Sequence, residues 1–125
     1  AVELLHENCR KFALTNVEII PGTAPEVLEN LPAPTHVFIG GSGGQMEEVI
    51  ALCLKKNPET RFVVNLITPE SLVTVLEAAK TLPVTEPDLV TLTAARSKKV
   101  GSSHLMMGQN PVWIVTFEGN NQGKK

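Results

Sequence analysis

The sequence lacks an excess of charge of either sign. Its 125 residues carry 11 Lys and Arg against 13 Asp and Glu, which gives a formal net charge of −2. A charge this small provides no overall attraction to nucleic acid or to an anionic membrane. No apolar run approaches the roughly 20 residues that a membrane-spanning helix needs, and no basic-then-apolar leader opens the sequence. We therefore expect no nucleic-acid partner, no membrane partner and no secretion signal within these residues.

Cysteine is also scarce. Cys9 and Cys53 each lie in a segment with helical apolar periodicity, and neither belongs to a C-x-x-C pair. Two cysteines are too few for a disulfide framework, and free cysteine is among the most buried residue types. We expect two reduced core thiols in a cytoplasmic protein. We expect no metal site, because no group of His, Cys, Asp and Glu has metal-ligand spacing.

Helical and strand patterns alternate along most of the chain. The apolar periodicity predicts helices over residues 1–14, 24–30, 45–56 and 68–81, and strands over residues 17–20, 36–39, 62–67, 89–96 and 111–117. Residues 62–67 are nearly all apolar, as in a strand that is covered on both faces. Residues 97–109 are expected to form a long polar loop. This order predicts an α/β fold with a parallel sheet, in which the last two strands form an antiparallel edge because no helix separates them.

Two patterns mark helix starts. Thr23 precedes Glu26 by three residues with Pro25 between them, which is the arrangement of a capping box. Thr68 and Pro69 stand before the last predicted helix, in the order typical of an N-cap and the first helical residue.

A glycine-rich loop, Gly-Gly-Ser-Gly-Gly, follows the strand at residues 36–39. Ligands of open α/β sheets bind beyond the carboxyl ends of strands, and glycines let backbone N–H groups approach them. The N-terminus of the following helix adds positive potential. A tight strand-to-helix turn, with Ser42 as N-cap and Gln45 as its capping-box partner, explains the same residues. No Gly-Lys-Ser/Thr follows and the spacing is not G-x-G-x-x-G, so neither a P-loop nor a dinucleotide fingerprint is present.

Several polar residues are further candidates for the predicted ligand site. Asn65 interrupts an apolar strand and Thr68 follows it, so each either positions a substrate or is satisfied structurally. The stretch 89–117 contains no acidic residue and has four basic or titratable side chains: Arg96, Lys98, Lys99 and His104. Arg and Lys suit a ligand with many carboxylates, and a solvated loop is the alternative. Met106 and Met107 either pack on a flat ligand or fill the core.

Four stretches carry a specific resemblance. They are N-V-E-I-I-P-G-T-A-P-E at residues 16–26, V-F-I-G-G-S-G-G at residues 37–44, V-V-N-L-I-T at residues 63–68 and N-P-V-W-I at residues 110–114. In this order and spacing they resemble the C15-methylating, decarboxylating domain of the precorrin C5,15-methyltransferases. The resemblance covers residues 1 to about 117. It implies a Rossmann-like class I S-adenosylmethionine-dependent methyltransferase sheet with an antiparallel C-terminal strand pair.

The function that this resemblance implies is methylation of a precorrin at C15, with decarboxylation of the C12 acetate, in cobalamin biosynthesis. A precorrin is a tetrapyrrole with many carboxylates, which the cationic stretch would suit. The implied S-adenosylmethionine site comprises Gly22, Thr23, Ala24, Gly40, Gly41, Ser42 and Gly43. The implied substrate site comprises Asn65, Thr68, Arg96, Lys98, His104 and Asn110. The family also implies a homo-oligomer, and no catalytic base can be named.

Two other functions remain open. The chain is either a non-catalytic Rossmann-like ligand-binding module or a methyltransferase for another small acceptor. Val112 follows Pro111, so the Asn-Pro-Pro-aromatic motif of amino-methylating enzymes is absent.

The sequence departs from the resembled family at its start. In that family a strand, a glycine-rich loop and a helix precede a second strand, whose acidic end binds the cofactor ribose, and none of these is present here. We expect residues 1–118 to be a partial methyltransferase domain that lacks the first strands and is inactive alone, with a flexible tail at 119–125. In the family sheet the missing strands separate residues 17–20 from residues 36–39. Without them, either the strand at residues 17–20 moves beside Val37, or another copy of the chain fills the gap in the sheet.

Overall fold

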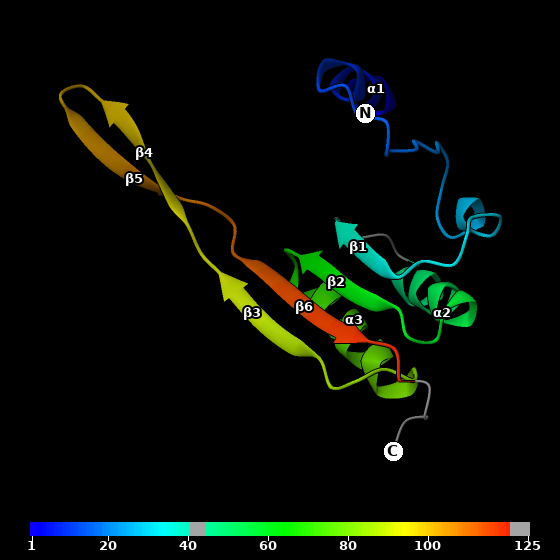
Figure 1. Cartoon of the computed structure of the whole chain (residues 1–125). Helices are drawn as coiled ribbons and strands as arrows, with labels where there is room; N and C mark the ends of the chain where they lie inside the picture. The colour runs from blue at the N-terminus through cyan, green and yellow to red at the C-terminus, as the bar shows by residue number, and fades with distance from the viewer. Residues whose placement is uncertain (41–44, 121–125) are drawn as a thin grey trace. The chain divides into compact units, whose positions relative to one another are not determined.

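The computed structural model describes residues 1–40 and 45–120, which belong to two compact units, Ala1–Leu31 and Pro32–Lys125 (Figure 1). The first unit contains α1 (Val2–Lys11) and one turn of 3-10 helix, η1 (Glu26–Leu28). Glu3 in the first turn of α1 and basic residues in its last turn complement the helix dipole. The helix ends where Ala13 adopts a φ of 53° and the N–H of Leu14 donates to the carbonyl of Cys9.

The first unit differs from the sequence-based prediction in two places. Residues 17–20 form no strand, because a strand needs a neighbour for its N–H and C=O groups and nothing within this unit pairs with them. The helix predicted at residues 24–30 is only η1, whose N-cap is Pro25, and no side chain caps it. The capping box of Thr23 and Glu26 is therefore wrong.

The second unit is built on a four-stranded sheet with the order β1-β2-β6-β3. The strands are β1 (His36–Gly40), β2 (Arg61–Leu66), β3 (Asp88–Leu92) and β6 (Val112–Glu118). β1 and β2 are parallel, and β6 lies antiparallel between β2 and β3. β1, β2 and β3 therefore all point the same way, and their carboxyl ends share one edge of the sheet. The predicted antiparallel pair is confirmed, and β3 rather than β6 is the outermost strand of the sheet.

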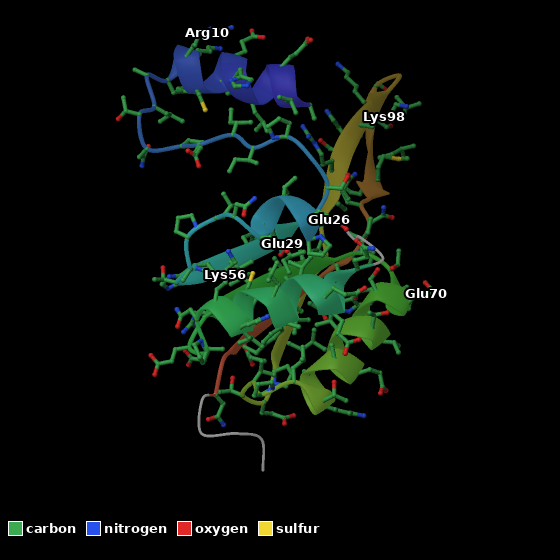
Figure 2. All side chains as sticks on the ribbon, turned by 90° about the vertical axis from the view of Figure 1, so that its right-hand side faces the viewer. Arg10, Glu26, Glu29, Lys56, Glu70 and Lys98 are labelled. Carbon is green, nitrogen blue, oxygen red and sulfur yellow. The ribbon has the colours of Figure 1, made fainter. Side chains whose placement is uncertain are left out.

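The helices of this unit confirm two further predictions. They are α2 (Met46–Lys56) and α3 (Pro69–Thr81), and both lie on the same face of the sheet (Figures 1 and 2). Alternate residues of β2, namely Phe62, Val64 and Leu66, are buried beneath them. The ring of Phe62 stacks on that of Phe117 with 5.2 Å between centroids. This face of the sheet forms the core.

The opposite face of the sheet carries no helix of this unit. Phe38 is 64% exposed there, and Val63 and Asn65 are only half-buried. Register places Ile114 and Val90 on the same face. The expectation that β2 is covered on both faces is wrong within this unit, because α2 and α3 pack against the same side.

A β-hairpin replaces the long polar loop predicted at residues 97–109. Its strands are β4 (Ala95–Val100) and β5 (Ser103–Gly108), which pair antiparallel around a two-residue turn. Gly101 begins that turn with a φ of 62°, a value that favours glycine. The strand predicted at residues 89–96 is accordingly divided between β3 and β4. All twelve strand residues of the hairpin are exposed, and it extends away from the sheet (Figure 1).

The chain stays fixed beyond β6. The N–H of Gly119 donates to the carbonyl of Thr60, and that of Asn120 donates to the carbonyl of Pro83, both at 2.8 Å. The first two residues of the predicted tail are thus held against the second unit, and residues 121–125 lie outside the described part of the chain.

Candidate functional site

The carboxyl edge of the sheet brings two predicted site residues together. The parallel register of β1 and β2 places Gly40 beside Asn65. Both lie on the open face. Gly40 is the last residue of β1, and Asn65 is one residue before the end of β2. This is the position at which open α/β sheets bind ligands, so the geometry supports a ligand site here.

Asn65 is suited to contact a ligand. Its side chain is half-buried on the open face, and it makes no hydrogen bond to another described residue. The sequence left open whether this amide is satisfied inside the protein or positions a substrate, and partial exposure removes the need for an internal partner. An amide that is held on a rigid strand can donate and accept hydrogen bonds without first breaking an internal one.

Gly40 leaves room for the ring of Phe38 on the open face. A side chain at position 40 would lie 2.8 Å from Cε2 of Phe38, on the same open face. The glycine therefore allows the Phe38 ring to lie along the strand. The other predicted residues of this loop, Gly41, Ser42 and Gly43, lie outside the described residues. The alternative with Ser42 as N-cap and Gln45 as its capping-box partner is wrong, because α2 begins at Met46 with Gln45 as its N-cap.

Thr68 has a structural role that the sequence allowed as an alternative. Its Oγ1 accepts a hydrogen bond from the N–H of Ser71 at 3.1 Å and lies 2.9 Å from Oγ of Ser71. Thr68 is thus the N-cap of α3, as predicted, with Pro69 directly after it. The hydroxyl lies near the carboxyl edge of β2, but its donor and one of its two acceptor sites are already used by Ser71.

The segment Gly22, Thr23 and Ala24 belongs to the first unit. Gly22 has a φ of 142°, and a side chain there would overlap Cγ1 of Val27. The carbonyl of Thr23 accepts the N–H of Val27 at 3.2 Å. Backbone conformation and packing therefore both demand glycine at position 22, and the turn is fixed by main-chain atoms rather than by the Thr23 hydroxyl.

The hairpin divides the predicted cationic residues between two faces. Arg96 pairs with Met107, Lys98 with Leu105, and Lys99 with His104. Because successive strand residues point to opposite faces, His104 and Lys99 lie on the face opposite Arg96 and Lys98. The structure therefore does not gather Arg96, Lys98 and His104 into one site, and Asn110 is exposed between β5 and β6.

Sequence reasoning raised Met106 and Met107 as possible ligand contacts, but it missed Leu105 and the division of these residues between two faces. Leu105 and Met107 share the face of Arg96 and Lys98, and they are 51% and 47% exposed. Met106, on the other face, is 66% exposed. Neither methionine fills the core, contrary to the interpretation that the sequence favoured. The signal that could have revealed this face is Gly101 placed midway between two short segments of equal length.

The remaining features of the described residues lie elsewhere. No three His, Cys, Asp or Glu side chains among them gather as a metal site would require. No helix in the described ranges is long and apolar enough to cross a membrane. Burial raises the pKa of the Cys53 thiol, and nearby Lys56 opposes this shift. A hollow of about 430 Å³ between Leu54 and Leu82 lies at the amino edge of β2, away from the edge at which such sheets bind ligands.

Comparison with known proteins agrees with this geometry. The family model described as the precorrin methyltransferase domain matches residues 1–118. A probable cobalt-precorrin-6B C(15)-methyltransferase (decarboxylating) of Pyrobaculum calidifontis is 31% identical over 117 residues, which are 93% of this chain and 60% of that protein. The cobalt-precorrin-6B C(15)-methyltransferase (decarboxylating) of Salmonella typhimurium is 31% identical over 94% of this chain and 61% of its own length. The chain thus spans about three fifths of these relatives.

Solved structures show the same similarity in three dimensions. The precorrin-6y C5,15-methyltransferase of Geobacter metallireducens superposes with a TM-score of 0.80 at 31% identity, over 93% of this chain and 61% of that one. A precorrin 8w decarboxylase of Methanobacterium thermoautotrophicum gives 0.81 at 26% identity, over 95% and 64%. An S-adenosylmethionine-dependent O-methyltransferase of Thermotoga maritima, at 12% identity, shares the fold with a TM-score of 0.66. The chain has the Rossmann-like α/β fold of these methyltransferases and belongs to the precorrin methyltransferase domain family.

Proposed function

We propose that this chain is part of an enzyme that methylates C15 of a precorrin and removes the C12 acetate carboxyl as carbon dioxide, in cobalamin biosynthesis. The match of residues 1–118 to the precorrin methyltransferase domain carries this proposal. The names of the relatives support the substrate and the decarboxylation. Because the chain spans about three fifths of those relatives, we expect it to be inactive alone.

S-Adenosylmethionine is the proposed methyl donor, and when bound it supplies an electrophilic methyl group. The described residues at the carboxyl edge of the sheet fit such a ligand. Gly40 has no side chain on the open face, and the neighbouring Asn65 amide makes no hydrogen bond to another described residue. The other residues predicted to bind the cofactor stay predictions: Gly41, Ser42 and Gly43 lie outside the described residues, and Gly22, Thr23 and Ala24 belong to the first unit.

The reaction requires the chain to hold two reactants in line rather than to supply a strong acid or base. The bond between the methyl carbon and sulfur breaks as the bond to C15 forms. The bond between the acetate methylene and its carboxyl carbon breaks as carbon dioxide leaves, and its electron pair enters the conjugated macrocycle. The residues proposed to orient the macrocycle are Asn65 at the carboxyl edge of the sheet, and Arg96 and Lys98 of the hairpin.

A direct test compares this chain with a version extended at its N-terminus to the length of the relatives. Each is titrated calorimetrically with S-adenosylmethionine and then assayed with precorrin-6B for methyl incorporation and carbon dioxide release by mass spectrometry. We expect binding and turnover in the extended version. Failure of the extended version to bind S-adenosylmethionine or to methylate would refute the proposal and favour a ligand-binding module without catalysis.

A further inference from the structure

We infer that one face of the β4–β5 hairpin binds the carboxylated macrocycle and that the opposite face does not. The strand residues of the binding face are Arg96, Lys98, Val100, Ser103, Leu105 and Met107. The opposite face includes Ser97, Lys99, His104 and Met106. This inference rests on the proposed function for the identity of the ligand, and on the register of the hairpin for the choice of face.

The hairpin leaves the sheet at the edge where the candidate site lies. β3 ends at Leu92 and the chain enters β4 at Ala95. β2 and β3 are both antiparallel to β6, so the end of β3 lies at the same edge of the sheet as Gly40 and Asn65. A ligand that is held at the carboxyl edge therefore lies on the side of the sheet from which the hairpin extends.

The chemistry of the binding face matches an apolar ring with carboxylates at its rim. Arg96 and Lys98 are two residues apart on one strand, which separates their Cα atoms by about 7 Å. Leu105 and Met107 lie directly across from them and are about half exposed. Neither cation forms an ion pair with a described residue. The guanidinium and the ammonium are therefore available for carboxylates while the apolar side chains contact the ring.

Charge argues against a second copy of the same face as the occupant. Two identical faces packed together would bring Arg96 and Lys98 of one copy near those of the other, and the hairpin has no acidic residue to separate them. Like charges across such an interface are destabilising. Nucleic acid fits poorly as well, because the binding face has no aromatic side chain on which a base could stack.

The opposite face provides matched controls. Lys98 and Lys99 are adjacent in sequence, carry the same charge and point to opposite faces, and so do Met107 and Met106. Figure 2 shows Lys98 on the hairpin, whose side chains extend from both sides of the ribbon. The same substitution at the two members of a pair makes the same chemical change on opposite faces. All four side chains are exposed, so the fold should tolerate each change.

The experiment measures binding of uroporphyrin, a stable tetrapyrrole with carboxylates on every pyrrole ring, to the 125-residue chain by fluorescence titration. We expect Lys98→Glu to weaken binding at least tenfold and Met107→Ser to weaken it several-fold. Lys99→Glu and Met106→Ser should each change it less than about twofold. Arg96→Lys should also weaken binding, because it keeps the charge but loses the bidentate geometry. Circular dichroism confirms that each variant is folded.

Three results would overturn the inference. Equal weakening by Lys98→Glu and Lys99→Glu would show diffuse attraction without a preferred face. Absence of uroporphyrin binding would remove the site. Dissociation of an oligomer by Met107→Ser in sedimentation, with unchanged uroporphyrin binding, would make the face an interface between copies. The titration needs neither S-adenosylmethionine nor turnover, so a face-specific binder that transfers no methyl group would refute the proposed function alone.

Discussion

The N–H of Gly119 donates a hydrogen bond to the carbonyl of Thr60, and this contact closes the amino edge of the sheet beyond β2 and β6. Thr60 is fully buried, and its hydroxyl donates to the carbonyl of Asn57 at 2.6 Å. Asn57 in turn donates from its side-chain amide to the carbonyl of Pro34 at 2.8 Å. The segment before β1, the end of α2 and the end of β6 are thereby held together on the side opposite the candidate site.

Substitution of Gly119 should destabilise the second unit. A Cβ at this position would overlap the backbone carbonyl of Pro58 and lie 2.8 Å from a methyl group of Leu54. A backbone group cannot move aside as a flexible side chain can, so we expect Gly119→Ala to lower the free energy of unfolding by about 1–3 kcal/mol. Urea denaturation followed by circular dichroism measures the change.

Gly108→Ala is the matched control for this prediction. Gly108 also lies at the end of a strand, but a Cβ there meets no atom within 4 Å. Its substitution should change stability by no more than about 0.5 kcal/mol. Equal effects of the two substitutions would show that the contact between Gly119 and Pro58 does not restrict this site.

Thr68 should matter for stability more than for ligand binding. Thr68→Ala removes the acceptor for the N–H of Ser71 and should cost about 1 kcal/mol of unfolding free energy. Thr68→Ser keeps the cap and should be nearly neutral. Thermal unfolding measures both variants. If Thr68→Ala instead left stability unchanged and weakened precorrin binding, the substrate role predicted from the sequence would be correct.

Local sequence patterns predicted the buried strands well. The apolar runs of β2 and β6 and the periodicity of α2 and α3 reflect burial, which is why apolar patterns predict them. β1 has no buried residue, but its half-buried Val37 and Ile39 pack against the core. The hairpin was missed because both of its faces are exposed; residues such as Ser97, Lys98 and Lys99 need not alternate between apolar and polar. The Thr23–Glu26 pattern failed because Pro25 becomes the N-cap of a single turn. The pairing of Gly40 with Asn65 depends on register, which no local pattern encodes.

The Cys53 thiol should make stability fall at alkaline pH. Burial raises its pKa above the ordinary value of 9.0. As pH rises past that value, the thiol of the unfolded chain ionises first, while the folded chain keeps its proton. The unfolded state then binds fewer protons, so the free energy of unfolding decreases with pH above about 9. Urea denaturation at several pH values from 7 to 10 measures this slope.

Cys53→Ala provides the control for that slope. It creates a small cavity and lowers stability at every pH, but it should flatten the decline above about pH 9. An identical decline in Cys53→Ala and the unsubstituted chain would assign the pH dependence to other groups.

Asn65 should matter for ligand binding and little for folding. Its amide is half-buried and makes no hydrogen bond to another described residue, so Asn65→Ala should change the free energy of unfolding by no more than about 0.5 kcal/mol. A polar contact at the carboxyl edge should be lost, which raises KM for the precorrin about tenfold in the extended enzyme.

Thr116→Ala tests whether position on the sheet decides this effect. Thr116 lies on the same open face and pairs with Val63, further from the carboxyl edge than Asn65. Its substitution should leave KM within about twofold of the starting value, because a ligand at the edge does not reach it. Similar KM values for Asn65→Ala and the unsubstituted enzyme would exclude Asn65 from the site. A tenfold rise for Thr116→Ala as well would place the ligand across the open face rather than at its carboxyl edge.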